Sequence, residues 1–294
     1  MGRTFIAPVS YGLGDLVVSL PAIQALIDSD QPVWLVARAS SQRLLAERIS
    51  GLAGVVEEAE LTCGPGDRIV DLRDHPLQRD FWWGSAAFEA QFGRLNINDI
   101  LERICVDFGI EADFSRPRPL RADPRSDLSS TVLLVHETDG AHKVWPARHW
   151  KAVDAMLRAE GHDTAMVLKT EGSSPAGIPG LVAPTPAVAV DVLSACQGVI
   201  GIDTGLTHIA VQQGTPTVTI CRLNSVYIRP WTHSAALRGD ACTDSCLDAE
   251  TRYAYNERVS LRNFQPRPRV CPSSSPCLAA TRPDDAVALL RELL

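Results

Sequence analysis

Short apolar runs alternate with amphipathic segments along the first third of the chain. The runs are rich in β-branched and aliphatic residues, which is typical of buried strands. In the segments between them, apolar residues recur every three to four positions, the period of a helix with one buried face. The pattern predicts strands at 4–9, 32–37 and 68–72 and helices at 15–27, 42–49 and 96–108.

The alternation stops at 115–130, where prolines and charged residues replace apolar ones, and then begins again. This segment has the composition of a linker. Alternating strands and helices indicate α/β domains with parallel sheets. We therefore expect two Rossmann-like domains, 1–120 and 121–294, with the option that the last helix packs back on the first domain. The second half is predicted to contain strands at 131–135, 164–168, 199–202 and 217–220 and helices at 146–159, 186–195, 206–213 and 282–294.

Composition narrows the classes of function. The chain has 294 residues, 28 basic against 35 acidic side chains, and a net charge of −7. Such a balance argues against a protein that coats nucleic acid, so any bound anion must be held by a local site. No apolar run reaches the roughly 20 residues of a membrane helix. The N-terminal pattern favours a first strand over a secretory signal, so we expect a cytoplasmic protein, with peripheral attachment to the inner membrane as an option.

The eight cysteines fall into two groups. The first four are scattered among apolar or loop residues and are expected to be ordinary small core residues. The last four lie within 242–277, a stretch to which the pattern assigns no element. In a cytosolic protein such a cluster indicates a zinc or iron site or redox chemistry more than disulfides. The alternative is four free thiols in a long loop. The candidate metal ligands are Cys242, Cys246, Cys271 and Cys277.

A glycine-rich turn follows the first predicted strand and ends at Asp15. It begins like a dinucleotide-binding turn, but the third glycine is replaced by Val17, so that fingerprint fails. What remains is a carboxylate presented at a helix N-terminus. Asp15 is either a catalytic base or simply a cap of its own helix.

A second turn joins an apolar strand to a helix through Asp203, Thr204 and Gly205. The glycine would let a ligand approach the backbone, and the N–H groups of a helix start can bind an anion. His208 falls in the first turn of that helix. An Asp-Thr-Gly sequence also occurs in aspartic proteases, but those need two such loops in an all-β context, whereas this chain has one in a βαβ pattern.

Two further strand ends carry candidate groups. Lys143 stands just before a predicted helix, where an ammonium can pair with a phosphate, although a solvated loop lysine is the common alternative. Asp71, Asp74 and His75 follow the third strand and form either a general base or a solvated turn.

Taken in order, three segments resemble glycosyltransferase family 9, the ADP-heptose:lipopolysaccharide heptosyltransferases. They are YGLGDLVVSLPAIQALIDSD at 11–30, HKVWPARHWKAVDAMLRAEGH at 142–162 and VIGIDTGLTHIAVQQGTPTVTI at 199–220. Segments 67–75 and 276–293 resemble the family more weakly. The resemblance implies the GT-B architecture, in which two Rossmann-like domains face each other across a cleft.

The resemblance also implies roles. Asp15 would be the general base that deprotonates the acceptor, and Lys143 would neutralise the leaving diphosphate. No metal would then be needed for catalysis. The donor, with ADP-heptose favoured, would be held by Gly14, Thr138, Asp203, Thr204, Gly205, Leu206 and His208. The implied activity is inverting transfer of a sugar to a glycan or other acceptor of lipopolysaccharide biosynthesis.

Two loops depart from the family pattern, at 136–140 and 221–225. Both flank the expected donor pocket. They motivate three alternatives: a catalytically silent relative that binds sugar nucleotides, a transferase acting on a protein or lipid-linked acceptor, and a GT-B epimerase. Some relatives carry a cysteine-bound metal near the C-terminus, which fits the late cysteines. Neither the acceptor nor the oligomeric state follows from the sequence.

Overall fold

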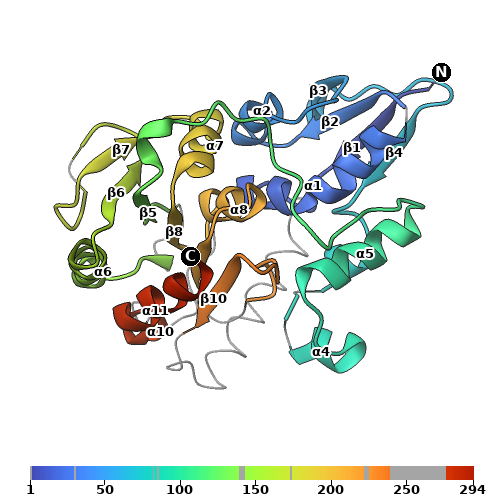
Figure 1. The fold of residues 1–294 in the computed structure, drawn as a ribbon. Helices are drawn as coiled ribbons and strands as arrows, with labels where there is room; N and C mark the ends of the chain where they lie inside the picture. The colour runs from blue at the N-terminus through green and yellow to red at the C-terminus, as the bar shows by residue number, and fades with distance from the viewer. Residues whose placement is uncertain are drawn as a thin grey trace.

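The computed structural model describes residues 2–29, 31–81, 83–84, 86–138, 143–172, 174–221, 225–238 and 276–294. Two parallel sheets with flanking helices make up the fold (Figure 1). The first sheet has the strand order β3-β2-β1-β4 and the second the order β10-β9-β8-β5-β6-β7. The α/β class and the two-sheet organisation expected from the sequence are confirmed.

The N-terminal half begins with β1, whose four residues are all buried. Its partners β2 and β4 run parallel to it on either side. Helix α1 contains Pro21, is buried from Leu16 to Gln24, and packs against α2, α5 and β2 of this half. The elements of this half are β1 (Thr4–Ala7), α1 (Leu13–Asp28), β2 (Val33–Ala37), α2 (Ser40–Ala46), β3 (Gly54–Glu57), the 3-10 turn Glu58–Glu60, β4 (Arg68–Asp71), α3 (Pro76–Arg79), α4 (Ala86–Phe92) and α5 (Ile97–Asp107).

The C-terminal half is built on two fully buried central strands, β5 and β8. Its elements are a 3-10 turn (Ser126–Leu128), β5 (Thr131–Val135), α6 (Ala147–Ala159), β6 (Asp163–Leu168), β7 (Gly180–Val182), α7 (Pro186–Ala195), β8 (Gly198–Ile202), α8 (Gly205–Gln212), β9 (Thr217–Cys221), β10 (Ser234–Arg238), α10 (Pro276–Ala280) and α11 (Pro283–Leu293).

Helix α11 lies against α6 and the strands β8, β9 and β10 of the second sheet. This differs from the expectation that the last helix could pack back on the first domain. Its buried face, formed by Ala286, Val287 and Leu290, completes the core on this side of the sheet. The helix therefore stays with its own half.

The two halves meet through α1 and α8, which lie side by side at the centre of the molecule (Figure 1). One hydrophobic cluster runs through both halves and includes Leu20 and Ile23 of α1 and Ile209 of α8. The expected domain boundary at 120/121 falls in the segment that joins α5 to the second half, and it stays a prediction.

That joining segment is fastened on both sides. Gln24 of α1 and Gln212 of α8 each donate a hydrogen bond to the carbonyl oxygen of Arg118, at 3.0 and 2.9 Å. Gln213 accepts from the N–H of Leu120 at 2.7 Å and donates to its carbonyl oxygen at 3.2 Å. The polar composition that indicates a linker thus belongs to a segment held between two helices.

A second contact between the halves comes from the residues after β9. Arg229 is buried, donates to Asn98 Oδ1 and to the carbonyl oxygen of Val18, and lies over the rings of Phe114 and Trp231. Burial lowers the pKa of Arg229 to about 9. Because Asn98, Val18 and Phe114 belong to the first half, the C-terminal half inserts an arginine into the core of its neighbour.

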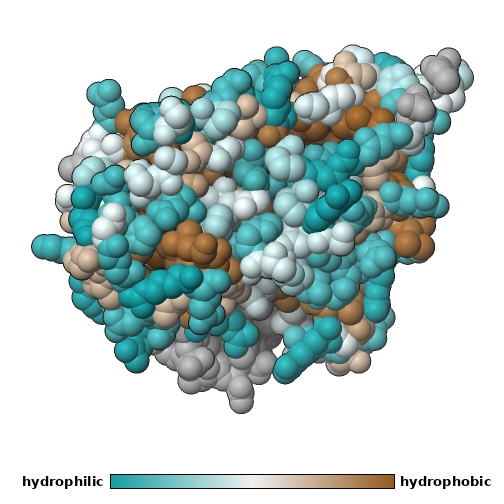
Figure 2. Space-filling view, viewed as in Figure 1, coloured by the Kyte–Doolittle hydropathy of each residue, from teal (hydrophilic) through white to brown (hydrophobic). Residues whose placement is uncertain are grey.

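Among the residues described, no helix is long and apolar enough to cross a membrane. Figure 2 shows one face of the molecule, where hydrophilic side chains separate several smaller apolar patches.

Candidate active site between the two helix starts

The turn between β1 and α1 carries the first candidate residue. Helix α1 begins at Leu13, so Asp15 is its third residue and Gly12 is the N-cap. The Gly12 N–H donates to Asp15 Oδ2 at 2.8 Å. Asp15 therefore supports its own helix start, as one interpretation held, but from the third position and not from the N-cap. Its side chain is half-buried.

The turn between β8 and α8 carries the second group. Thr204 is the N-cap and Gly205 the first residue of α8. The Thr204 N–H donates to Thr207 Oγ1 at 3.1 Å, and that hydroxyl lies 2.9 Å from the carbonyl oxygen of Ile202. The hydroxyl of Thr207 is thus used to shape the turn, while the N–H groups of Gly205 and Leu206 have no acceptor within the helix because they belong to its first turn.

The side chains of Lys143, Asp203 and His208 converge at the start of α8. Lys143 Nζ donates to Asp203 Oδ2 at 2.8 Å and to the Asp203 carbonyl oxygen at 3.0 Å. His208 Nε2 lies 3.2 Å from Asp203 Oδ1. Burial alone would raise the pKa of Asp203, but Lys143 and His208 outweigh it and hold that pKa well below its usual range. Asp203 is therefore a carboxylate that organises the lysine and the histidine.

The starts of α1 and α8 touch each other. A Cβ added at Gly205 would lie 2.8 Å from Leu13 Cβ, and one added at Gly14 would lie 2.8 Å from His208 Cδ2. Only glycine fits at these two positions without a shift. In the structure the small size of Gly205 admits Leu13 of the other half, and its predicted role in admitting a ligand stays a prediction. The turns that carry Asp15 and Asp203 are thereby brought to one place.

One donor-site candidate remains, in the loop after a neighbouring strand. Thr138 lies half-buried in the loop after β5, the strand next to β8 in the sheet. In the same loop, Glu137 accepts from the Lys169 N–H at 3.0 Å, and burial lowers the pKa of His136. All of these residues follow the carboxyl ends of parallel strands, where α/β sheets bind ligands.

The alternative base candidates after β4 are engaged in local contacts. Asp71 pairs with Arg38 at 2.7 Å, and Asp74 pairs with Arg79 at 3.4 Å. His75 Nδ1 accepts from the Leu77 N–H at 3.2 Å, which leaves Nε2 to donate to Asp107 at 3.0 Å. These contacts favour structural roles. The same residues line an open groove of about 1390 Å³ beside α5, whose floor includes Phe81, Phe92 and Phe108.

Two residues near the candidate base were not selected from the sequence. Gln42 and Arg38 both contact the turn that carries Asp15. Arg38 directly follows β2, so its place at the carboxyl end of a strand was an available signal. Gln42 sits inside a helix and had no such signal.

The cysteine predictions have mixed outcomes. Cys105, Cys196 and Cys221 are buried, as expected, but Cys63 is exposed, so the prediction that it is a core residue is wrong. It lies in a polar loop before β4 that offers no core to join. Cys242, Cys246, Cys271 and the side chain of Cys277 lie outside the described residues. Among the described residues, no group of three or more His, Cys, Asp or Glu side chains could hold a metal ion.

Comparison with known proteins supports the resemblance seen in the motifs. The family model for glycosyltransferase family 9 (heptosyltransferase) matches residues 180–254. No curated protein sequence matches the chain.

Solved structures match over most of the chain. A glycosyl transferase family 9 protein from Veillonella parvula has a TM-score of 0.65 at 12% identity, covering 99% of this chain and 97% of that one. The E. coli heptosyltransferase WaaC with ADP has a TM-score of 0.61 at 13% identity, covering 86% and 99%. The iron-containing dodecameric glycosyltransferase TibC from enterotoxigenic E. coli has a TM-score of 0.65 at 14% identity, covering 99% and 76%.

At these identities the matches establish the fold, which is that of the GT-B glycosyltransferases. The family match covers the part of the chain that holds β7, α7, β8, α8 and the Asp203 turn. Together with the fold, it makes this chain similar to glycosyltransferase family 9 (heptosyltransferase) over residues 180–254, within a fold that it shares with the GT-B glycosyltransferases.

Proposed function

We propose that this protein is an inverting glycosyltransferase that moves a heptose from an ADP-sugar to a glycan or lipopolysaccharide-type acceptor. The observation that carries the proposal is the contact between the starts of α1 and α8, which places the Asp15 turn against the Lys143–Asp203–His208 cluster. In this proposal Asp15 is the base for the acceptor and Lys143 the cation for the leaving group.

The reaction follows from these groups. Asp15 accepts the proton of the acceptor hydroxyl, whose oxygen attacks the anomeric carbon while the bond to the diphosphate breaks. Negative charge grows on the leaving ADP, where Lys143 and the first-turn N–H groups of α8 stabilise it. Removing one preorganised donor of this kind typically costs about 3–4 kcal/mol of barrier. Asp203 holds Lys143 Nζ in place through its carboxylate and its carbonyl oxygen.

The choice of donor is supported by the family match and by two solved structures of the same fold. WaaC was solved with ADP-2-deoxy-2-fluoro heptose and TibC with ADP-D-beta-D-heptose. For the acceptor we propose only a chemical class, a glycan or lipopolysaccharide-type molecule, with a protein as the alternative.

The test is the Asp15→Ala variant, assayed for ADP release and for donor affinity by calorimetry. We expect transfer to be abolished while donor affinity stays within about twofold, because Asp15 acts on the acceptor. Asp28→Ala is the matched control, since Asp28 ends the same helix and pairs with Arg118 on the surface. Transfer that persists in Asp15→Ala would refute the proposed base.

A silent sugar-nucleotide binder is the second candidate, favoured by the loops at 136–140 and 221–225 that depart from the family pattern. Wild-type protein that binds ADP-sugars but releases no ADP with a broad acceptor pool would support it. Release of ADP without any acceptor would instead point to an epimerase or hydrolase.

We also propose that the four late cysteines hold zinc or iron. The support is their clustering in sequence and the iron in TibC, a protein of the same fold. Elemental analysis of protein purified without added metal tests this, and a content below about a tenth of an equivalent would refute it.

A further inference from the structure

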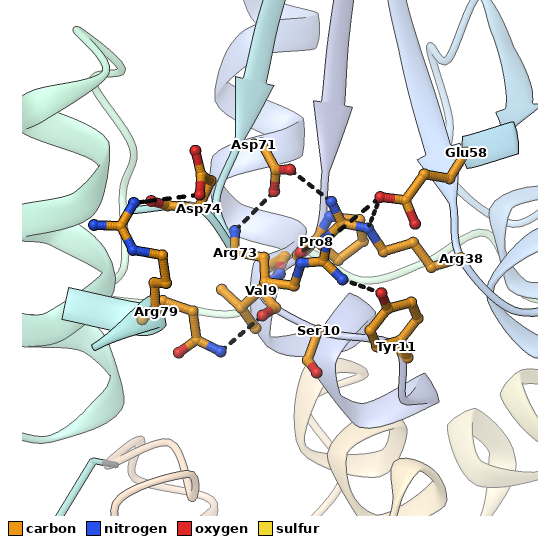
Figure 3. A network of polar contacts seen from close by, with 12 residues as sticks. Pro8, Val9, Ser10, Tyr11, Arg38, Glu58, Asp71, Arg73, Asp74 and Arg79 are labelled. Carbon is orange, nitrogen blue, oxygen red and sulfur yellow. Dashed lines mark hydrogen bonds and ion pairs between the residues drawn. The ribbon is translucent and has the colours of Figure 1, made fainter. Parts of the chain in front are cut away.

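The backbone that carries Asp15 is held by buried side chains from other elements. Residues 8–12 form the turn between β1 and α1, and four of their carbonyl oxygens accept side-chain hydrogen bonds. Figure 3 shows this turn, with Arg38 reaching toward Pro8, Asp71 and Glu58, and Arg73 reaching toward Tyr11. Side chains from outside the turn therefore hold most of its carbonyl oxygens.

Gln42 makes the central contacts. Its side chain is fully buried, and Nε2 donates to the carbonyl oxygens of Ser10 at 2.9 Å and Gly12 at 3.1 Å. Its Oε1 accepts from the Arg38 N–H at 2.9 Å. Both ends of the amide are therefore used, and a fully satisfied buried polar group holds its partners rigidly.

The hydrogen bonds continue from Gln42 to Asp15. Gln42 fixes the residue Gly12, whose N–H holds Asp15 Oδ2 at 2.8 Å. On the other side, Ser19 Oγ accepts from the Val9 N–H at 3.2 Å and donates to the Asp15 carbonyl oxygen at 2.7 Å. The carboxylate is thus placed through a chain that starts at the end of β2 and passes through α2.

We infer that Gln42 is a positioning residue for the transfer reaction, because it fixes the turn whose Gly12 N–H holds the Asp15 carboxylate. The inference rests on the proposed function, in which Asp15 is the base. Gln42 touches neither donor nor acceptor in this assignment. A displacement of about 1 Å at a reacting group is enough to cost up to roughly a hundredfold in rate.

The experiment compares two buried glutamines. Gln42→Met keeps the length of the side chain and removes both donors, and Gln42→Glu replaces them with a carboxylate that faces two carbonyl oxygens. The controls are Gln24→Met and Gln24→Glu, because Gln24 is also buried and donates to a carbonyl oxygen, that of Arg118, on the side of α1 next to the joining segment. For each variant kcat, KM for both substrates, calorimetric donor affinity and thermal unfolding are measured.

We expect Gln42→Met to lower kcat on the order of tenfold and Gln42→Glu by more, with donor affinity within twofold of wild type. The Gln24 variants should lose thermal stability to a similar degree with kcat within twofold. A loss of kcat that tracks thermal stability equally in both series would overturn the inference. So would wild-type kcat in Gln42→Met.

If the Gln42 variants do not fold, a smaller substitution tests the same positioning of Asp15. Ser19→Ala removes only the hydroxyl between Val9 and Asp15 and leaves a good helix former inside α1. It should lower kcat several-fold at unchanged donor affinity, and an unchanged kcat would count against positioning through this turn. Failure of the proposed function is recognised separately, because then Asp15→Ala itself retains transfer.

Discussion

The contact between the two helix starts makes Gly205→Ala an informative single-atom change. The added Cβ would lie 2.8 Å from both Cβ and Cγ of Leu13 and 2.9 Å from its Cδ2. All three distances are shorter than real Cβ contacts allow. Since Leu13 belongs to the other half of the molecule, the substitution pushes α1 and α8 apart.

Two effects of opposite sign determine how much Gly205→Ala changes the free energy of unfolding. Overpacking of this kind costs about 1–3 kcal/mol. Alanine in place of glycine stabilises a helix by about 0.5–1 kcal/mol, and by less at the first helical residue. The net expectation is a loss of about 1–2 kcal/mol, which lowers Tm by about 2–3 °C in a chain of this size. Transfer activity should fall as well, because the shift separates Asp15 from the Asp203 cluster.

The assay is thermal unfolding of Gly205→Ala beside Gly172→Ala, where no atom lies within 4 Å of the added Cβ. Leu13→Ala in the Gly205→Ala background removes two of the three close contacts, so Gly205→Ala should cost less there than in wild type. If Gly205→Ala is as stable and active as Gly172→Ala, the two helix starts do not pack as described, and the site between them is wrong.

Three further changes test the site and its surroundings. Lys143→Met leaves the Asp203 carboxylate without its cation and should lower kcat on the order of a hundredfold with a stability loss of about 1–2 kcal/mol, measured by turnover and urea unfolding. Asp203→Asn should cost about 2 kcal/mol at pH 7. The pKa of Asp203 is lower in the folded chain than its unfolded value of about 3.9, so this contribution to stability is present above roughly pH 5 and declines in acid. Urea unfolding of wild type and Asp203→Asn at pH 7 and pH 3 should therefore show a smaller stability difference at pH 3. A difference that stays constant would contradict the ion pairing. Burial raises the pKa of Cys105 and of Cys196 to about 12, so peptide mapping after iodoacetamide treatment should find exposed Cys63 modified in the native protein and these two only after unfolding.

Central elements of the fold were predictable because buried strands and helices show continuous apolar runs or a helical period of apolar residues in the sequence. The strand at 131–135 and the helix at 186–195 are found with the same bounds. The missed strands β3, β7 and β10 all lie at edges of their sheets. An edge strand has one neighbour and more solvent, so its sequence needs no continuous apolar run. The short helices α3, α4 and α10 lack enough turns to show a period.

The site was predictable only as separate turns. Strand ends followed by Asp15, Lys143 and Asp203 stand out because parallel sheets collect such turns at one edge. The pairing of Lys143 with Asp203 spans 60 residues, and the contact of Gly205 with Leu13 joins two halves of the chain. Neither has a periodic or local signal. Gln42 was missed for the same reason, since its partners are main-chain oxygens that any sequence supplies.

The glutamine contacts on the joining segment bear on how this chain tolerates changes in length. Gln24, Gln212 and Gln213 bind particular carbonyl and N–H groups of residues 118 and 120, so one added or deleted residue there would shift every partner out of register. The loop at 62–66 is exposed, and its hydrogen bonds go to Arg3 and Asp67 beside it and not to the helices between the halves. Insertions, tags and permuted termini should therefore be accepted in that loop and rejected in the segment whose composition suggests a flexible linker.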